Sequence, residues 1–302
     1  MILVDWGTSN LRAYKINSQG FLLEQRSSQY GILQVQPGDF PCTLLHQIGD
    51  WLDDGETRVL LSGMVGSRQG WVEAGYLPCP VGVDELAAAV IDVPFERAEV
   101  RLVPGVRGYD AQGLPEVMRG EETQIAGLLD AGFSAGLICL PGTHSKWATV
   151  NGGRIESFLT YMTGDVYAAL RSGTILGRMM TEVAAVDREA FLEGVHRSAD
   201  AGGLLHHLFG VRTLGLTNRL KVESSASYLS GLLIGHEVRL AMPASSPVQL
   251  VGASTLCSLY QFAIRACGGS STTEGEDCAA RGLAAIAGRL SWTWMSGSRN
   301  AR

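Results

Sequence analysis

Small polar residues follow an acid near the start of the chain, in a pattern suited to a nucleotide phosphate. An apolar run, Met1 to Val4, predicts a buried strand, and Asp5 stands at its end. The turn that follows contains Gly7, Thr8, Ser9 and Asn10. Its glycine allows close backbone approach, and its hydroxyls, amide and N–H groups can donate to phosphate oxygens. Asp5 suits the Mg²⁺ that accompanies a nucleotide, while an ordinary polar hairpin turn is the alternative.

A second turn of this kind lies near the middle of the chain. A strand predicted over 136–140 runs into this turn, and a return strand follows over 147–150. In the turn, Thr143 can contact phosphate oxygens and Lys146 can neutralise their charge, although a solvated hairpin lysine fits equally. His144 can donate to a phosphate or stabilise the turn. The turn consists of Pro141, Gly142, Thr143, His144, Ser145 and Lys146.

The elements that position these turns follow the same order in both halves of the chain. Each half opens with a strand, a Gly-Thr turn and a return strand, and later has a buried strand entering a glycine turn, at Gly63 and at Gly252. This indicates an α/β protein whose two similar lobes offer their turns to a shared cleft, although strand–glycine–helix units also recur by chance. Helices are predicted over 40–52, 119–129, 165–176, 186–198, 224–242 and 278–290.

The composition excludes several classes of protein. At 302 residues and 46% hydrophobic, the chain can form two cores. Its net charge of −6 and pI near 5.5 argue against a nucleic-acid or anionic-membrane partner. No apolar run reaches the ~18 residues that span a bilayer. Six scattered cysteines predict reduced thiols rather than disulfides or a zinc site. We expect a cytoplasmic protein, with a homodimer as one alternative for its assembly.

Four stretches in order resemble the 2-dehydro-3-deoxygalactonokinase family of the actin-like ATPase and sugar kinase superfamily. The likeness runs from residue 1 to about residue 288. It implies two ribonuclease-H-like domains around a central cleft, which we place at residues 1–132 and 133–302. The stretches are Asp5 to Asn10, Arg119 to Gln124, Pro141 to Trp147 and Met162 to Asp165.

The resemblance also implies an activity, namely phosphorylation of the terminal hydroxyl of 2-dehydro-3-deoxy-D-galactonate by ATP and Mg²⁺. Asp5 would hold the metal, and the turn Gly252-Ala253 would contact the adenosine. Two alternatives remain, a kinase of the same fold for another sugar or sugar acid and a nucleotide-binding sensor without phosphoryl transfer. The residues implied at the phosphates are Thr8, Ser9, Asn10, Gly142, Thr143 and Lys146.

An acceptor hydroxyl needs a carboxylate that takes its proton. Related kinases carry an acid after a glycine at a helix start, commonly Gly-Asp, and this chain has Gly120-Glu121 there. Glu122 points about 100° further around the helix, so only one of the two acids can face the cleft. Both could instead be first-turn acids that complement the helix dipole. Asp165 is the second candidate base.

The carboxylate and 2-keto group of the implied substrate call for a cation and hydrogen-bond donors. Arg68, in the loop after the strand predicted over 58–62, is the preferred candidate. Arg107 and Arg12 are the alternatives. Each of the three can equally be an ordinary surface arginine.

Overall fold

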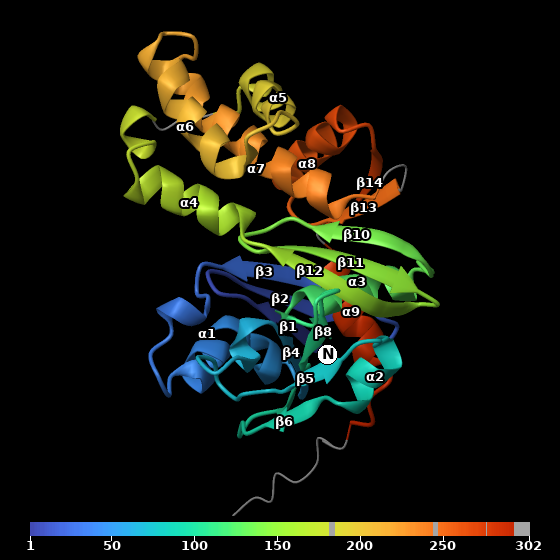
Figure 1. Ribbon diagram of the computed structural model, residues 1–302. Helices are drawn as coiled ribbons and strands as arrows, with labels where there is room; N and C mark the ends of the chain where they lie inside the picture. Colours follow the sequence, from blue (N-terminus) through green and yellow to red (C-terminus); the bar gives the residue numbers. More distant parts are fainter. Residues whose placement is uncertain (181–184, 244–246, 276, 293–302) are drawn as a thin grey trace, which may run out of the picture. The chain divides into compact units, whose positions relative to one another are not determined.

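The computed structural model describes residues 1–180, 185–243, 247–275 and 277–292 (Figure 1). These residues form two compact units. The first unit comprises Met1–Ala135, Val150–Ser157 and the described residues from Asp277 on, and the second comprises the described residues of Gly136–Thr149 and Phe158–Glu276. The contacts thus group the last helix with the first unit, and the domain division after residue 132 stays a prediction.

Two sheets carry the fold and repeat one strand order. The first has the order β3-β2-β1-β4-β7-β6 and the second β12-β11-β10-β13-β14. In each, the opening strand lies between its hairpin partner and a later parallel strand. The repeated order confirms the predicted pair of ribonuclease-H-like domains. The strands are β1 (Ile2–Trp6), β2 (Leu11–Ile16), β3 (Leu22–Ser28), β4 (Arg58–Ser62), β6 (Ile91–Val93), β7 (Glu99–Leu102), β10 (Gly136–Leu140), β11 (Ser145–Asn151), β12 (Arg154–Tyr161), β13 (Pro247–Val251) and β14 (Ser270–Glu274).

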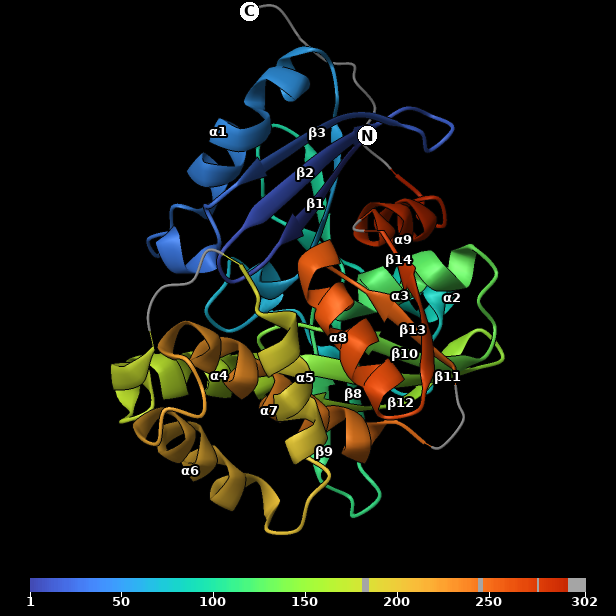
Figure 2. The same ribbon diagram turned by 90° about the horizontal axis from the view of Figure 1, so that it is seen from above.

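Helices cover both faces of the first sheet, as the view in Figure 2 shows for β1 and β2. Helix α1 (Phe40–Asp53) packs on the face that carries Val4 and Leu61. Residues on the opposite face, such as Leu3, are also fully buried, because α9 (Cys278–Ala287) contacts β1 there. Beside these elements the first unit contains α2 (Val83–Ala88), α3 (Glu121–Asp130) and a three-stranded sheet of β5 (Tyr76–Pro78), β8 (Gly105–Tyr109) and β9 (Pro115–Met118).

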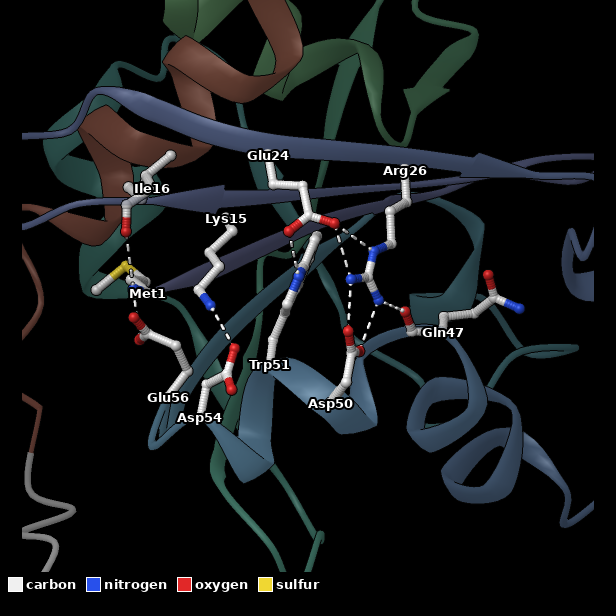
Figure 3. Close-up of polar contacts among 10 residues, drawn as sticks. All are labelled: Met1, Lys15, Ile16, Glu24, Arg26, Gln47, Asp50, Trp51, Asp54 and Glu56. Atoms are coloured by element: carbon white, nitrogen blue, oxygen red, sulfur yellow. Dashed lines mark hydrogen bonds and ion pairs between the residues drawn. The ribbon is translucent and has the colours of Figure 1, made fainter.

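Hydrogen bonds and an ion pair between polar side chains connect α1 to β3, as Figure 3 shows. The Arg26 guanidinium donates to both Asp50 oxygens at 2.6 Å and to Glu24 at 2.8 Å. It also lies 4.1 Å from the centroid of the Trp51 ring, whose N–H donates to Glu24. Arg26 holds the pKa of the Asp50 carboxyl down at about 2. The edge strand of the sheet is therefore tied to the helix that covers it.

In the second unit, the helices lie on one side of the sheet (Figure 1). Its helices are α4 (Thr163–Gly173), α5 (Arg188–Arg197), α6 (Gly203–Leu216), α7 (Ser225–Ala241) and α8 (Ser254–Ala266). The six predicted helices are confirmed, each end to within three residues, as α1, α3, α4, α5, α7 and α9. Helix α6 was not predicted, because its apolar residues occur on the exposed side (Leu205, Phe209) as well as on the side that packs on the core (Val211), so its sequence lacks a clear apolar stripe.

Glycines allow two helix pairs to pack with unusually close backbones. In the first unit, a Cβ added at Gly282 of α9 would overlap the Thr123 carbonyl of α3. In the second unit, a Cβ added at Gly231 of α7 would overlap the Phe191 carbonyl of α5.

Among the described residues, no helix is long and apolar enough to cross a membrane. The short 3-10 helices are η1 (Ile32–Gln34), η2 (Met64–Gly66), η3 (Gly177–Met179) and η4 (Val222–Ser224).

Candidate functional site

The first predicted phosphate turn is the tip of the β1–β2 hairpin, and a second loop fixes its backbone. The N–H of Gly7 donates to the Asn10 carbonyl over 2.9 Å and closes the tip. Successive N–H groups of 31–33 donate to the carbonyls of Ser9, Gly7 and Thr8 at 3.2, 3.0 and 3.3 Å. The side chains of residues 8–10 are exposed. The turn is thus held through its carbonyls, while its hydroxyl and amide groups are accessible to a ligand.

Replacing Gly31 by alanine should destabilise the first unit, because the added Cβ would overlap the Thr8 carbonyl and the Ser9 backbone. We expect the free energy of unfolding to fall by about 1–3 kcal/mol, as for other overpacked sites. Urea denaturation of Gly31→Ala measures this loss. Gly210→Ala is the matched control, because nothing lies within 4 Å of a Cβ at this position of α6. If Gly31→Ala is as stable as Gly210→Ala, close packing of residues 31–33 against the turn does not stabilise the first unit.

Glycines bring Asp5 and the start of α3 together at the carboxyl ends of β1 and β4. Asp5 pairs in parallel register with Ser62, and Gly63 follows with a φ of 91°. A Cβ at Gly63 would lie 2.8 Å from the Trp6 carbonyl oxygen and 3.3 Å from Asp5 Oδ1. A Cβ at Gly120 would in turn lie 3.4 Å from the Gly63 Cα. The first unit thus places Asp5 near Glu121, although more than a hundred residues separate them.

Burial and two neighbouring charges set the protonation of Asp5 in this corner. Asp5 is half-buried, and the loss of solvent around its carboxyl raises its pKa to about 6. The Arg12 charge, directly across the hairpin, opposes this rise, whereas the Glu121 charge adds to it. A cation at Asp5 would stabilise both ionised carboxylates, and carboxylate oxygen is a ligand that Mg²⁺ prefers.

The two acids that open α3 occupy different environments. Glu122 is fully buried, and its carboxyl accepts from the Gly120 N–H at 2.7 Å. Burial first, and the Glu121 charge second, raise the pKa of Glu122 to about 8. Glu121 is only half-buried and accepts from the Arg119 N–H at 3.1 Å. Of the two, Glu121 is therefore the accessible carboxylate, and its role as a base stays a prediction.

Replacing Glu122 by glutamine should flatten the pH dependence of stability. The folded pKa is about 8 and the ordinary value is 4.5, so between these values the folded protein keeps a proton that the unfolded chain releases. The wild-type free energy of unfolding therefore falls as pH rises through this window, by up to about 1.4 kcal/mol per pH unit from this group. Urea unfolding at pH 5.5 and 7.5 measures the slope. Glu96→Gln, at an exposed position, should keep the wild-type slope; an unchanged slope in Glu122→Gln would contradict the burial argument.

The second predicted turn follows β10 and packs against the start of α4. The Asp165 N–H donates to the Thr143 carbonyl over 3.0 Å, and a Cβ at Gly164 would lie 2.5 Å from the Gly142 carbonyl. His144 Nε2 lies 3.6 Å from an Asp165 carboxylate oxygen. Asp165 is thus a first-turn helix residue that contacts this turn, and its role as second candidate base stays a prediction.

Lys146 is buried, with 4% of its surface exposed, in the second position of β11. Its ammonium donates to the His144 carbonyl over 3.2 Å. The alternative of a solvated hairpin lysine is therefore wrong. Gly252, at the end of β13, stands beside the same turn, since a Cβ there would lie 3.7 Å from the Pro141 carbonyl. Ala253 next to it is exposed.

A cavity of about 450 Å³ opens beside the second turn, within the second unit. Tyr260, which lines the cavity, donates from Oη to the Glu237 carboxylate at 2.8 Å, and Trp147 Nε1 donates to the same carboxylate at 2.7 Å. Burial raises the pKa of the Glu237 carboxyl. Most residues of this wall were not among the predicted site residues, although Thr163, Tyr167 and Arg171 recur every four residues along α4, which was a usable signal. The lining includes Gly142, Thr143, Thr163, Tyr167, Arg171, Ser230 and Tyr260.

The three predicted substrate arginines all belong to the first unit. Arg68 is exposed, pairs with Glu73 at 3.1 Å and lines a second cavity of about 360 Å³. Arg107 is exposed on β8, and Arg12 lies beside Asp5. A fourth arginine, Arg119, is buried in the wall of the same cavity as Arg68, and it was not among the predicted substrate residues.

Comparisons with known proteins cover both units. The sequence pattern of the 2-keto-3-deoxy-galactonokinase family matches residues 5–286. A probable 2-dehydro-3-deoxygalactonokinase of Rhizobium meliloti (strain 1021) is 34% identical over 296 residues, 96% of each chain. The 2-dehydro-3-deoxygalactonokinase of Escherichia coli (strain K12) is 32% identical over 92% of this chain and 94% of its own. The crystal structure of a Sinorhizobium meliloti protein, provisionally assigned the same activity, superimposes with a TM-score of 0.87 at 34% identity, covering 95% of this chain and 97% of that one.

Proposed function

Because this chain belongs to the 2-keto-3-deoxy-galactonokinase family, we propose that it phosphorylates the terminal hydroxyl of 2-dehydro-3-deoxy-D-galactonate. ATP is the phosphoryl donor, and the products are 2-dehydro-3-deoxy-6-phosphogalactonate and ADP. The observation that carries the proposal is the family match over residues 5–286, which includes both turns and the start of α3.

The cavity of the second unit suits the adenosine of ATP. Its volume of about 450 Å³ is that of a small-molecule site, and a mainly apolar wall with a few polar groups is typical of such sites. The predicted adenosine contact, Gly252-Ala253, follows β13 and stands beside the second turn. Thr143 lines the cavity and can donate to a phosphate, and the Lys146 charge lies in the next strand. We therefore assign nucleotide binding to these residues, together with Gly142.

The first unit supplies hydroxyl and carboxylate groups for the transfer. The exposed side chains of Thr8, Ser9 and Asn10 can hold phosphate oxygens. Asp5 would hold Mg²⁺, since its enclosed carboxyl beside a second acid fits a hard cation. When bound, the ion supplies positive charge for the phosphates.

Glu121 acts on the acceptor in this proposal. As the terminal hydroxyl oxygen forms its bond to the γ-phosphorus, the hydroxyl proton moves to the Glu121 carboxylate. The bond between the γ-phosphorus and the bridging oxygen breaks, and ADP leaves with that electron pair. Accessibility supports Glu121 in this role, because the neighbouring Glu122 is fully buried and holds its proton to a pKa of about 8.

The test is ADP release from ATP and Mg²⁺ with three additions: 2-dehydro-3-deoxy-D-galactonate, its gluconate epimer, or no acceptor. We expect release that requires the galactonate. Turnover that prefers the gluconate would make the chain a kinase for another sugar acid. No acceptor-dependent release with either compound would refute the kinase proposal and leave a nucleotide-binding protein.

A further inference from the structure

A buried arginine lines the second cavity and has no anionic partner among the residues that the structure describes. Arg119 is 8% exposed and directly precedes the glycine that opens α3. One of its guanidinium nitrogens, Nη2, donates to the Ala74 carbonyl over 2.6 Å, and the group lies 4.4 Å from the centroid of the Tyr76 ring. The other two nitrogens, Nε and Nη1, are shielded from water and have no hydrogen-bond partner among the described residues.

The nearby acids do not neutralise this charge. Within the described part of the chain, no carboxylate forms an ion pair with Arg119. The Arg119 charge lowers the pKa of Glu122, but burial outweighs this effect. The resulting pKa of about 8 keeps the Glu122 carboxyl largely protonated at neutral pH. Glu73, on the same cavity, already pairs with Arg68. A buried charge without a partner is costly, so its presence beside a cavity points to an anion supplied from outside.

A second unpartnered group lies on the same cavity. Ser67 Oγ is also shielded and has no hydrogen-bond partner among the described residues. Its backbone follows η2, where a Cβ at Gly66 would lie 2.9 Å from Arg119 Nη1. The absence of a side chain at Gly66 thus makes room for the guanidinium. A guanidinium with two unpartnered nitrogens and a hydroxyl beside it suit an anion with more than one acceptor oxygen, such as a carboxylate.

We propose that Arg119, assisted by Ser67, binds the carboxylate of the sugar acid in the cavity of about 360 Å³ that both residues line. This inference rests on the proposed function, since it takes the acceptor to be a sugar acid. Nε and Nη1 are shielded from water in this conformation, so binding requires the guanidinium to turn toward the cavity. Arg119 then determines specificity for acids over neutral sugars, in place of the exposed Arg68.

The test compares the sugar acid with its C1 amide, which has the same shape without the charge. In wild type the acid should be the better acceptor. In Arg119→Met the KM for the acid should rise about 30-fold or more, as expected for a lost charge-assisted pair, while the KM for ATP changes little. The preference for acid over amide should therefore collapse. Arg119→Lys should retain part of that preference, and Ser67→Ala should weaken acid binding alone.

Controls separate this inference from a structural role and from the proposed function. Arg97→Met removes an exposed arginine that pairs with Asp53 and should leave the preference unchanged. Equal losses for acid and amide in both Arg119 variants would show that Arg119 only holds the loop that contains Ala74. Loss of preference in Arg68→Met but not in Arg119→Met would move the site to Arg68. If Arg119→Met does not fold, Arg119→Lys and Ser67→Ala decide. Absence of turnover with any acceptor in wild type would instead refute the proposed function.

Discussion

Replacing Glu121 by glutamine is expected to lower kcat by about 100-fold or more, because the amide cannot take the proton of the attacking hydroxyl. The substitution keeps the size of the side chain and an oxygen that can accept from the Arg119 N–H. Folding and the KM for ATP should therefore change little. Acceptor-dependent ADP release, measured at saturating ATP and sugar acid, gives the loss in kcat directly.

Two other variants identify the base if Glu121 is not the residue that takes the proton. Asp165→Asn changes the second candidate, which contacts the turn at Thr143 through its N–H. Glu122→Gln changes the buried neighbour, which cannot reach a ligand without leaving its hydrogen bond to Gly120. A full kcat in Glu121→Gln with a large loss in Asp165→Asn would assign the base to Asp165. A full kcat in all three would exclude every carboxylate considered for the role.

Filling the cavity of the second unit should weaken ATP binding selectively. Ser230, on α7, is half-buried and lines this cavity. A tryptophan there would occupy much of the space assigned to adenosine, so we expect the KM for ATP to rise by about 10-fold or more. The KM for the sugar acid should stay within about twofold, because the assigned acceptor residues belong to the first unit. Steady-state kinetics with each substrate varied in turn separate the two effects.

The control for this prediction is Ser258→Trp. Ser258 lies on α8 of the same unit and is exposed, and its hydroxyl donates to the Ser254 carbonyl one turn earlier. Its tryptophan variant should therefore bind ATP as the wild type does. If Ser230→Trp also retained the wild-type KM for ATP, the adenosine would have to bind elsewhere, and the assignment of this cavity would fail.

Local spacing in the sequence was sufficient for most of the fold. The hairpins around Gly7 and Gly142 follow from strand patterns interrupted by small polar residues, and the six predicted helices follow from apolar residues at helical spacing. Helix α6 was missed because apolar residues lie on both its packed and its exposed sides, such as Val211 on the core and Leu205 and Phe209 in solvent, so its sequence has no one-sided apolar stripe. The repeated order of elements in the two halves likewise indicated two domains of one type, which the strand orders of the two sheets confirm.

Other features depended on contacts between distant segments. The sequence named Asp5 and Glu121 as separate candidates, but packing at Gly63 and Gly120 determines that they share one corner. Only burial distinguishes Glu121 from Glu122, and only burial shows that Lys146 lies inside the unit. Arg119 looks like any other arginine in the sequence, because a missing counter-charge is a property of its surroundings. Residue type and spacing thus determined the elements and the candidate chemistry, whereas solvation and long-range packing, which spacing does not encode, decided which charged groups are available to a ligand.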